Sequence, residues 1–232
     1  MYDKQIFLIN EEVKKIGLSD KALDKFFVAG GALTSVFSNK KINDLDLFFY
    51  DKWKYDDLRS EMGEKDWKPV FESDSAVSYN INGVRFQLIK KVFGTPEEVI
   101  KNFDFSVCMC ACTLAPEKKI IMDDNFLYHL AQRTLYFNIN AKYPISSLWR
   151  VKKYLKKDFT FPAIEAIKIS LAINNLNIKS YIDLKEQLEG IDTLFLADLT
   201  DALLLKKDAV YDFREAIEYM NDILSKKLGL ED

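Results

Sequence analysis

The stretch Phe26–Asp51, FFVAGGALTSVFSNKKINDLDLFFYD, contains two adjacent glycines, twelve further residues, and then two aspartates separated by one leucine. The apolar and aromatic residues around the aspartates predict a strand over residues 44–51. Because side chains alternate between the two faces of a strand, Asp44 and Asp46 are expected on one face, with the neighbouring leucines entering a core. Two such carboxylates repel each other unless a cation lies between them. The stretch therefore predicts a cation site.

The double glycine indicates which kind of ligand binds together with the cation. Carboxylate oxygens favour Mg²⁺ or Mn²⁺, but an Asp-x-Asp sequence alone is also common at solvated strand ends. Gly30 and Gly31 open a short predicted helix over residues 31–38, where N–H groups unhindered by a Cβ can approach phosphate. A tight turn or close helix packing is the alternative explanation for the glycines. Together, the two signals indicate a site for a nucleoside triphosphate and its divalent metal ion.

These residues resemble the signature of the DNA polymerase beta-type nucleotidyltransferase superfamily. Within it, the double glycine is similar to that of CCA-adding tRNA nucleotidyltransferases and bacterial poly(A) polymerases. A second segment, residues 102–123 (NFDFSVCMCACTLAPEKKIIMD), is similar in outline to the family's Asp-Phe-Thr segment and its following hairpin. Asp104, Phe105 and Ser106 occupy the Asp-Phe-Thr positions. The resemblance covers about residues 26–123.

The chain also departs from this family pattern. Asn102 and Phe103 stand where the family has two arginines, and residues 32–35 (ALTS) replace a Val-Arg-Asp that follows the double glycine in many CCA-adding enzymes. The tail motifs that select CTP and ATP are not recognisable. The resemblance therefore implies a divergent, virus-like member of the superfamily rather than a CCA-adding enzyme of strict specificity.

The family normally has a third carboxylate, on a strand beside the Asp-x-Asp strand, and two positions compete for it. Asp104 lies between two phenylalanines, the apolar-acid-apolar pattern of that ligand, and is the expected residue. Gln87, in the predicted strand VRFQLIKK over residues 84–91, is the alternative, and its neutral amide is a poorer Mg²⁺ ligand. The resemblance thus implies Asp44, Asp46 and Asp104 as catalytic, metal-binding residues.

Further residues are candidates for holding the nucleotide or an acceptor. The predicted helix over residues 146–155 carries basic residues beside an apolar stripe. It is expected either to clamp a triphosphate or an RNA backbone, or to be an ordinary solvated face. Surface lysines are common, so each of these assignments is weak by itself. The nucleotide-binding candidates are Gly30, Gly31, Ser35, Lys40, Arg150 and Lys153, with Lys41, Arg85 and Lys90 as further basic candidates.

Composition limits the function classes. With 33 basic and 36 acidic residues the formal net charge is -3, so nucleic-acid binding requires a local patch. No segment is long and apolar enough for a membrane span, and a cytoplasmic location is expected, in the host cell or a virion if virus-encoded. Cys108, Cys110 and Cys112 share one face of a predicted strand and are expected to be buried rather than metal-binding. The single histidine, His129, is expected to pack or to be solvated on a helix.

The hydrophobic pattern predicts an α+β protein: a mixed-sheet nucleotidyltransferase-type head over residues 1–122 and an all-helical domain over residues 123–232. In the head, Asn82 and Gly83 predict a tight hairpin turn, and Thr95 and Pro96 a helix start. Expected helices cover 20–27, 31–38, 55–63, 95–103, 123–133, 146–155, 162–173, 179–190, 192–205 and 209–228; expected strands cover 44–51, 75–81, 84–91, 105–114 and 120–123.

Three functions remain open from the sequence. The first is transfer of a nucleoside monophosphate from an NTP to an RNA 3′ end, such as that of a tRNA. The second retains this chemistry with a protein or small-molecule acceptor. The third is a catalytically degenerate head with a nucleotide-binding or assembly role, which Gln87 and the missing arginines favour and the retention of Asp44 and Asp46 opposes.

Overall fold

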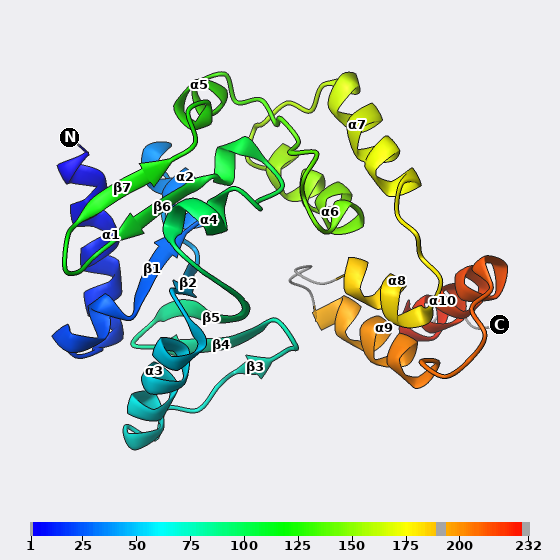
Figure 1. Cartoon of the computed structure of the whole chain (residues 1–232), viewed down its shortest axis with the longest axis horizontal. Helices are drawn as coiled ribbons and strands as arrows, with labels where there is room; N and C mark the ends of the chain where they lie inside the picture. Colours follow the sequence, from blue (N-terminus) through cyan, green and yellow to red (C-terminus); the bar gives the residue numbers. More distant parts are fainter. Residues whose placement is uncertain (1, 189–193, 229–232) are drawn as a thin grey trace. The chain divides into compact units, whose positions relative to one another are not determined.

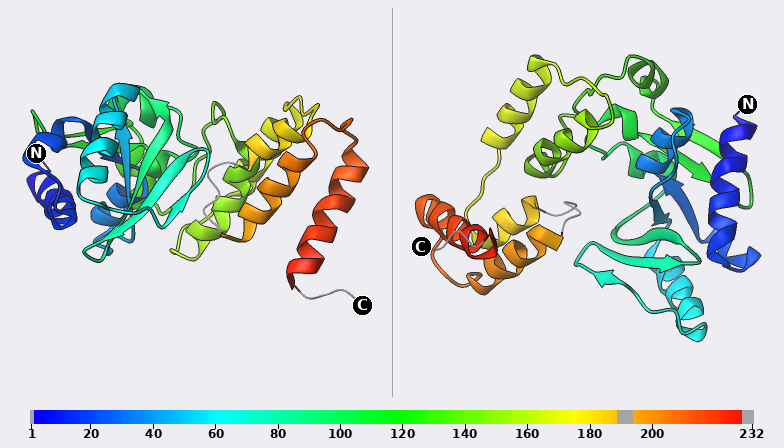
Figure 2. Two further views of the ribbon diagram at one scale, coloured as in Figure 1. Left: turned by 90° about the horizontal axis from the view of Figure 1, so that it is seen from below. Right: turned by 180° about the vertical axis from the view of Figure 1, so that it is seen from behind.

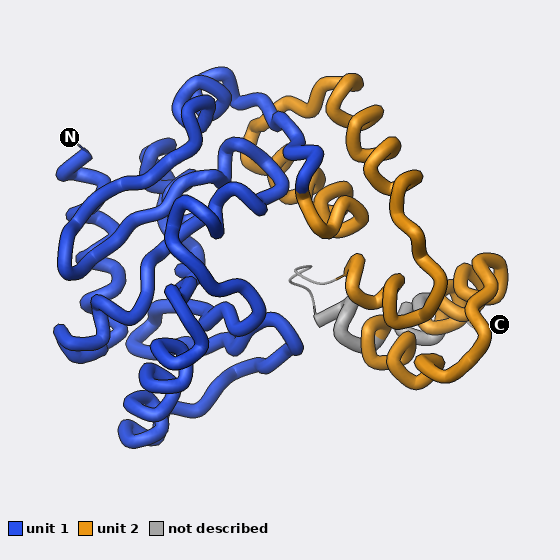
Figure 3. The backbone as a smooth tube through the Cα atoms, in the orientation of Figure 1, with its two compact units in different colours: residues 1–140 blue, residues 141–232 orange. Residues whose placement is uncertain are grey.

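A computed structural model describes residues 2–188 and 194–228 of the chain. The chain forms two compact units, residues 1–140 and 141–232 (Figure 3). Residues 123–140 thus belong to the first unit. The division into 1–122 and 123–232 stays a prediction about where the nucleotidyltransferase-like part ends.

One mixed sheet of seven strands organises the described part of unit 1, in the order β3-β4-β5-β2-β1-β6-β7 (Figure 1). β2 and β5 are parallel, and the other neighbouring strands are antiparallel. This open sheet with flanking helices confirms the predicted α+β class. The strands are β1 (Phe26–Ala29), β2 (Leu45–Phe49), β3 (Phe71–Glu72), β4 (Ala76–Ile81), β5 (Val84–Phe93), β6 (Cys110–Thr113) and β7 (Lys119–Met122).

Helices cover the sheet because its central strands are apolar on both faces (Figures 1 and 2). On one face, Val99 and Ile100 of α4 pack with Phe27, Phe48 and neighbouring side chains. The opposite face includes the fully buried leucines of β2, and α2 and α3 both contact this strand. The helices of unit 1 are α1 (Asp3–Ile16), α2 (Gly31–Phe37), α3 (Lys52–Glu64), α4 (Pro96–Ile100) and α5 (Phe126–Ala131).

The described part of unit 2 is helical, as the sequence predicts. Tyr181, Leu184, Leu199 and Leu203 form its buried cluster, together with Ala216. Parts of two predicted helices, residues 189–190 and 192–193, lie outside the described residues. The helices are α6 (Pro144–Leu155), α7 (Ala163–Asn174), α8 (Tyr181–Gln187), α9 (Leu194–Leu205) and α10 (Phe213–Leu228).

Two predicted elements of the head were wrong in kind. Residues 20–27 form a short 3₁₀ turn, Asp20–Asp24, followed by the strand β1 rather than one helix. β1 is a strand because it lies in the middle of the sheet between β2 and β6, where all four of its side chains are buried. The expected strand over 105–114 starts only at Cys110, because a 3₁₀ turn, Ser106–Cys108, precedes it.

Other local predictions were confirmed. Asn82 and Gly83 both have positive φ, 52° and 79°, at the β4–β5 hairpin. Thr95 caps α4 in a reciprocal capping box with Glu98, and Pro96 is at the first turn. Within residues 2–188 and 194–228, no helix is both long and apolar enough to cross a lipid bilayer.

Candidate functional site

The site begins where β1 turns into α2, next to the beginning of β2. In the antiparallel pairing of β1 with β2, Ala29 lies opposite Asp46. Gly30 follows with φ 82° and ψ -132°, a conformation that side chains rarely adopt. A Cβ built at Gly30 would lie 3.9 Å from Oδ2 of Asp46. The first glycine therefore brings bare backbone against the Asp46 carboxylate.

Gly31 keeps the space in front of this turn open. A Cβ built there would meet no heavy atom within 4 Å. Two contacts hold the turn in place: the Gly30 N–H donates to the Cys110 carbonyl oxygen at 3.0 Å, and the Thr34 hydroxyl donates to the Val107 carbonyl oxygen at 2.6 Å. The glycine pair is thus a fixed, unobstructed backbone surface beside a carboxylate, which suits a phosphate group accompanied by a cation.

The strand beside β2 places Gln87, the alternative candidate for the third ligand, next to Asp46. In the parallel pairing of β2 with β5, Gln87 lies next to Asp46, and paired residues point to the same face of a sheet. Both side chains are half-buried, as is that of Asp44, which immediately precedes β2. An amide oxygen, rather than a carboxylate, therefore stands beside the Asp-x-Asp pair.

Asp104 lies in the segment between α4 and β6 and is buried. Its carbonyl oxygen accepts the Asn138 N–H at 2.8 Å, and the Asn138 amide donates to the carbonyl oxygens of Lys101 and Phe103. Among the residues that the structure describes, no three His, Cys, Asp or Glu side chains are grouped so as to hold a metal ion. The structure therefore groups no third acid with Asp44 and Asp46, and metal binding by Asp104 stays a prediction.

Phe103, which stands at one of the family's arginine positions, is the site residue that the sequence did not indicate. Its ring edge would lie 3.6 Å from a Cβ at Gly30, and its ring centroid is 5.5 Å from that of Phe48. An apolar ring thus borders the glycine turn, at a position where the family that the sequence resembles has an arginine. The sequence feature that could have indicated Phe103 is the pair of phenylalanines on either side of Asp104.

The other predicted nucleotide-binding residues are dispersed. Ser35 is buried on α2, and its hydroxyl donates to the Gly31 carbonyl oxygen at 3.0 Å. Lys40 is exposed beyond the opposite end of α2 from the glycines. Arg150 and Lys153 lie on α6 in unit 2. Unit 1 by itself therefore brings Gly30, Gly31, Asp44 and Asp46 to one place, and the roles of the others stay predictions.

The donor set fits one Mg²⁺ carried in by a nucleotide. Mg²⁺ is usually bound by one or two carboxylates, substrate phosphates and waters. Asp46 supplies one carboxylate beside the glycine turn, and Asp44, two residues earlier in the chain, is the candidate for the second. A second ion that activates an attacking hydroxyl would need another strong ligand. Gln87 offers only a neutral oxygen at that position.

Solved structures that resemble this chain are CCA-adding enzymes. The complex of a CCA-adding enzyme with ATP superposes with a TM-score of 0.59 at 14% identity, covering 98% of this chain and 55% of that chain. The Thermotoga maritima CCA-adding enzyme complexed with tRNA gives a TM-score of 0.50 at 15% identity, over 93% of this chain and 55% of that chain. At such identities the likeness shows the fold alone, and it confirms the predicted nucleotidyltransferase resemblance.

Two comparisons at the sequence level are more specific. A family model described as "Gad2: Gabija anti-defense 2 family protein" matches residues 3–133. A protein named "Gabija anti-defense 2" from Bacillus phage SPbetaL7 is 34% identical over 198 residues, covering 85% of this chain and 48% of the phage protein. The chain thus spans about half the length of this relative. The phage source confirms the prediction of a divergent, virus-like member.

Proposed function

Because the chain belongs to the Gabija anti-defense 2 family and its fold is that of nucleotidyltransferases, we propose that it transfers a nucleoside monophosphate from an NTP to an acceptor. The acceptor that the resemblance favours is an RNA 3′ end. The activity would serve the anti-defence role that the name of the phage relative states, in the cytoplasm of the infected host cell.

One observation carries this proposal: the Asp46 carboxylate lies against the bare backbone of Gly30, with open space at Gly31. A triphosphate combines high negative charge with a bound divalent ion. It therefore needs both an unhindered backbone surface and carboxylates for the ion. The β1–α2 turn and β2 supply these two requirements side by side.

The proposed reaction assigns a limited set of roles. Asp44 and Asp46 would hold Mg²⁺ or Mn²⁺, which when bound neutralises charge on the triphosphate. Gly30 and Gly31 would hold the phosphates close to these carboxylates. The acceptor hydroxyl oxygen forms a new P–O bond to the α-phosphate and gives up its proton to water, while the bond to pyrophosphate breaks. This chain therefore contributes position and charge rather than a covalent intermediate.

An RNA acceptor is supported by two features. Solved structures of the same fold include CCA-adding enzymes in complex with tRNA and with ATP. In this chain, α6 carries basic residues at neighbouring positions. Because the whole chain has a net charge of -3, binding of RNA phosphates needs a local group of cations such as this one. We therefore propose Arg150 and Lys153 as contacts to phosphate groups of the nucleotide or the RNA.

The test is transfer of label from each of the four α-labelled NTPs to bulk RNA with Mg²⁺ or Mn²⁺. The variants are Asp44→Asn with Asp46→Asn, and Asp56→Asn as the control, because Asp56 is an exposed carboxylate on α3. Metal-dependent transfer that is lost only in the double variant supports the proposal. Label on a protein or a small molecule would show that the acceptor is of that class rather than RNA. Absence of transfer to every acceptor would contradict the proposal that the chain is an enzyme.

A second function is favoured by Gln87 standing beside Asp46. A head without the third carboxylate could bind an NTP with one metal ion and use it for regulation or assembly rather than transfer. Calorimetric titration of each NTP with Mg²⁺ separates the two functions, because binding that depends on Asp44 and Asp46 without any product identifies the binding protein.

A further inference from the structure

A row of paired residues extends from Asp46 to the edge of the sheet. Asp46 of β2 pairs with Gln87 of β5, Gln87 with Ser78 of β4, and Ser78 with Phe71 of β3. Paired residues on neighbouring strands point to the same face. Phe71 and Ser78 therefore share the face of the sheet that carries the candidate metal ligands.

This part of the face is accessible and chemically mixed. The Phe71 side chain is 41% exposed, and Ser78 is half-buried. The next pair along the hairpin on the same face is Asn80 with Arg85, and both residues are exposed. An aromatic ring, a hydroxyl, an amide and a guanidinium thus lie together on one side of the carboxylates. We call Phe71, Ser78, Asn80 and Arg85 the hairpin face.

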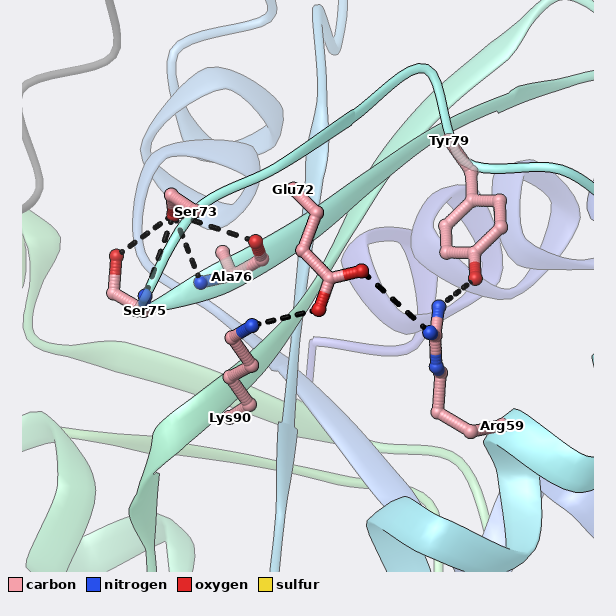
Figure 4. Close-up of polar contacts among 7 residues, drawn as sticks. All are labelled: Arg59, Glu72, Ser73, Ser75, Ala76, Tyr79 and Lys90. Atoms are coloured by element: carbon pink, nitrogen blue, oxygen red, sulfur yellow. Dashed lines mark hydrogen bonds and ion pairs between the residues drawn. The ribbon is translucent and has the colours of Figure 1, made fainter. Parts of the chain in front are cut away.

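Phe71 is held on this face by its neighbour. Glu72 points to the opposite face, where it pairs with Lys90 at 2.7 Å and Arg59 at 3.7 Å (Figure 4). Arg59 also donates to the Tyr79 hydroxyl. Because adjacent side chains of a strand alternate, anchoring Glu72 to α3 and β5 directs the ring of Phe71 toward the Asp46 face.

The turn after β3 is also fixed. The Ser73 hydroxyl oxygen accepts hydrogen bonds from the backbone N–H groups of Ser75 at 3.3 Å and Ala76 at 3.2 Å (Figure 4). The two-residue strand β3, Phe71–Glu72, is thus held both by the ion pairs of Glu72 and by the hydrogen bonds of the turn that follows it. Its exposed aromatic ring is consequently presented in a defined position.

We propose that the hairpin face binds the single-stranded 3′ segment of an RNA acceptor, with Phe71 stacking on a base and Arg85 contacting a phosphate. The inference rests on the proposed function, since it names the surface that holds the acceptor. Three strand spacings, roughly 14 Å, separate the positions of Phe71 and Asp46. Phe71 therefore contacts a nucleotide upstream of the one that reacts.

The chemistry of the hairpin face fits RNA better than a protein partner. Single-stranded RNA is bound by exposed aromatic rings that stack on bases, by cations, and by polar groups that reach base edges. A protein interface of the usual kind would need a contiguous apolar centre. Phe71 instead has Ser78 and Asn80 as its neighbours on this face.

The test measures the affinity of a short fluorescent oligoribonucleotide by anisotropy, for the whole chain and three variants. Phe71→Leu keeps the apolar bulk and removes the ring, whereas Phe71→Trp keeps a stacking surface. Trp53→Leu is the matched control, because Trp53 is a 70% exposed aromatic residue on α3. We expect roughly 5- to 100-fold weaker binding for Phe71→Leu, and affinities near wild type for the other two.

Parallel titration with NTP and Mg²⁺ distinguishes this inference from the proposed function. Phe71→Leu is expected to leave NTP affinity unchanged. RNA affinity that is unchanged in Phe71→Leu, or a wild-type protein that binds no RNA while still binding NTP, overturns the hairpin face as the acceptor surface and leaves nucleotidyl transfer standing. Loss of NTP affinity with retained RNA affinity would show that Phe71 serves the nucleotide, and it also overturns the inference.

Discussion

Gln87 lies directly beside Asp46 in the parallel pairing of β5 with β2, on the face of the sheet where the glycine turn also ends. The amide has nearly the shape of a glutamate side chain but carries no charge. The neighbour of Asp46 on β5 therefore offers an oxygen without negative charge, and a change of one residue can supply that charge.

We expect Gln87→Glu to strengthen Mn²⁺ or Mg²⁺ binding in the presence of NTP and to raise the rate of transfer by about tenfold or more, because a third carboxylate stabilises a second ion. The measurement is single-turnover transfer over a range of metal concentrations. Gln132→Glu is the control, since it makes the same amide-to-acid change at an exposed residue at the end of α5, outside the sheet. Equal rates for Gln87→Glu and wild type would contradict the third-ligand position.

The two glycines are expected to differ when each is replaced by alanine. Gly30→Ala should lower the free energy of unfolding by roughly 1–3 kcal/mol, because a Cβ is disfavoured at φ 82° and ψ -132°. Gly31→Ala should fold with nearly wild-type stability, since its Cβ would meet no atom within 4 Å, and should nevertheless weaken NTP binding by occupying the open space. Urea denaturation and NTP titration of both variants check this, and normal NTP binding in Gly31→Ala would argue against phosphate at this turn.

The sequence predicted this site where local chemistry decides the structure. The helix start at the glycine pair, the strand that contains Asp46 and the Asn82–Gly83 turn each depend on a few neighbouring residues, and the structure has all three elements. The role of the glycines and aspartates as a site stays a prediction. The sequence did not predict β1, because its four apolar residues follow the segment Asp20–Asp24, whose residues also fit a helix. Its strand form depends on pairing with β2 and β6, which are distant in sequence.

The choice between Gln87 and Asp104 illustrates the same limit. Asp104 is the expected third ligand because it lies between two phenylalanines, and Gln87, in the middle of its predicted strand, is the alternative. The register of β5 against β2 shows which residue stands beside Asp46, and register depends on the hydrophobic patterns of both strands and on the segments that connect strands. The placement of Phe71 on the same face follows from register in the same way.

The three cysteines are expected to be unreactive in the folded protein. Cys108, Cys110 and Cys112 are all buried. Burial raises the pKa of the Cys110 thiol, with a further increase from neighbouring Cys112, and burial raises the pKa of Cys112 to about 12. Because the thiolate is the reactive form, a thiol reagent at pH 8 should label none of them until denaturant is added. Rapid labelling of the native protein would contradict their burial.

The ion pairs of Glu72 with Lys90 and Arg59 should make the free energy of unfolding depend on pH. The hydrogen bond from Lys90 holds the pKa of Glu72 below its ordinary value of 4.5, and the nearby charges of Lys90 and Arg59 act in the same direction. A lowered folded pKa means that the stabilisation is complete above about pH 4.5 and is lost as the pH falls through the folded value. We expect Glu72→Gln to cost roughly 0.2–1 kcal/mol at pH 7, a small effect because the pair is partly solvated.

Urea denaturation of wild type and Glu72→Gln between pH 7 and pH 3 measures this difference, which should vanish at the acidic end. Glu64→Gln, at an exposed residue near the end of α3, is the control and should show a smaller pH dependence. If Glu72 positions Phe71 as proposed, RNA affinity at pH 7 should also fall in Glu72→Gln and remain unchanged in Glu64→Gln. A stability difference that persists to pH 3 would show that the Glu72 side chain acts through packing, since its charge is absent there.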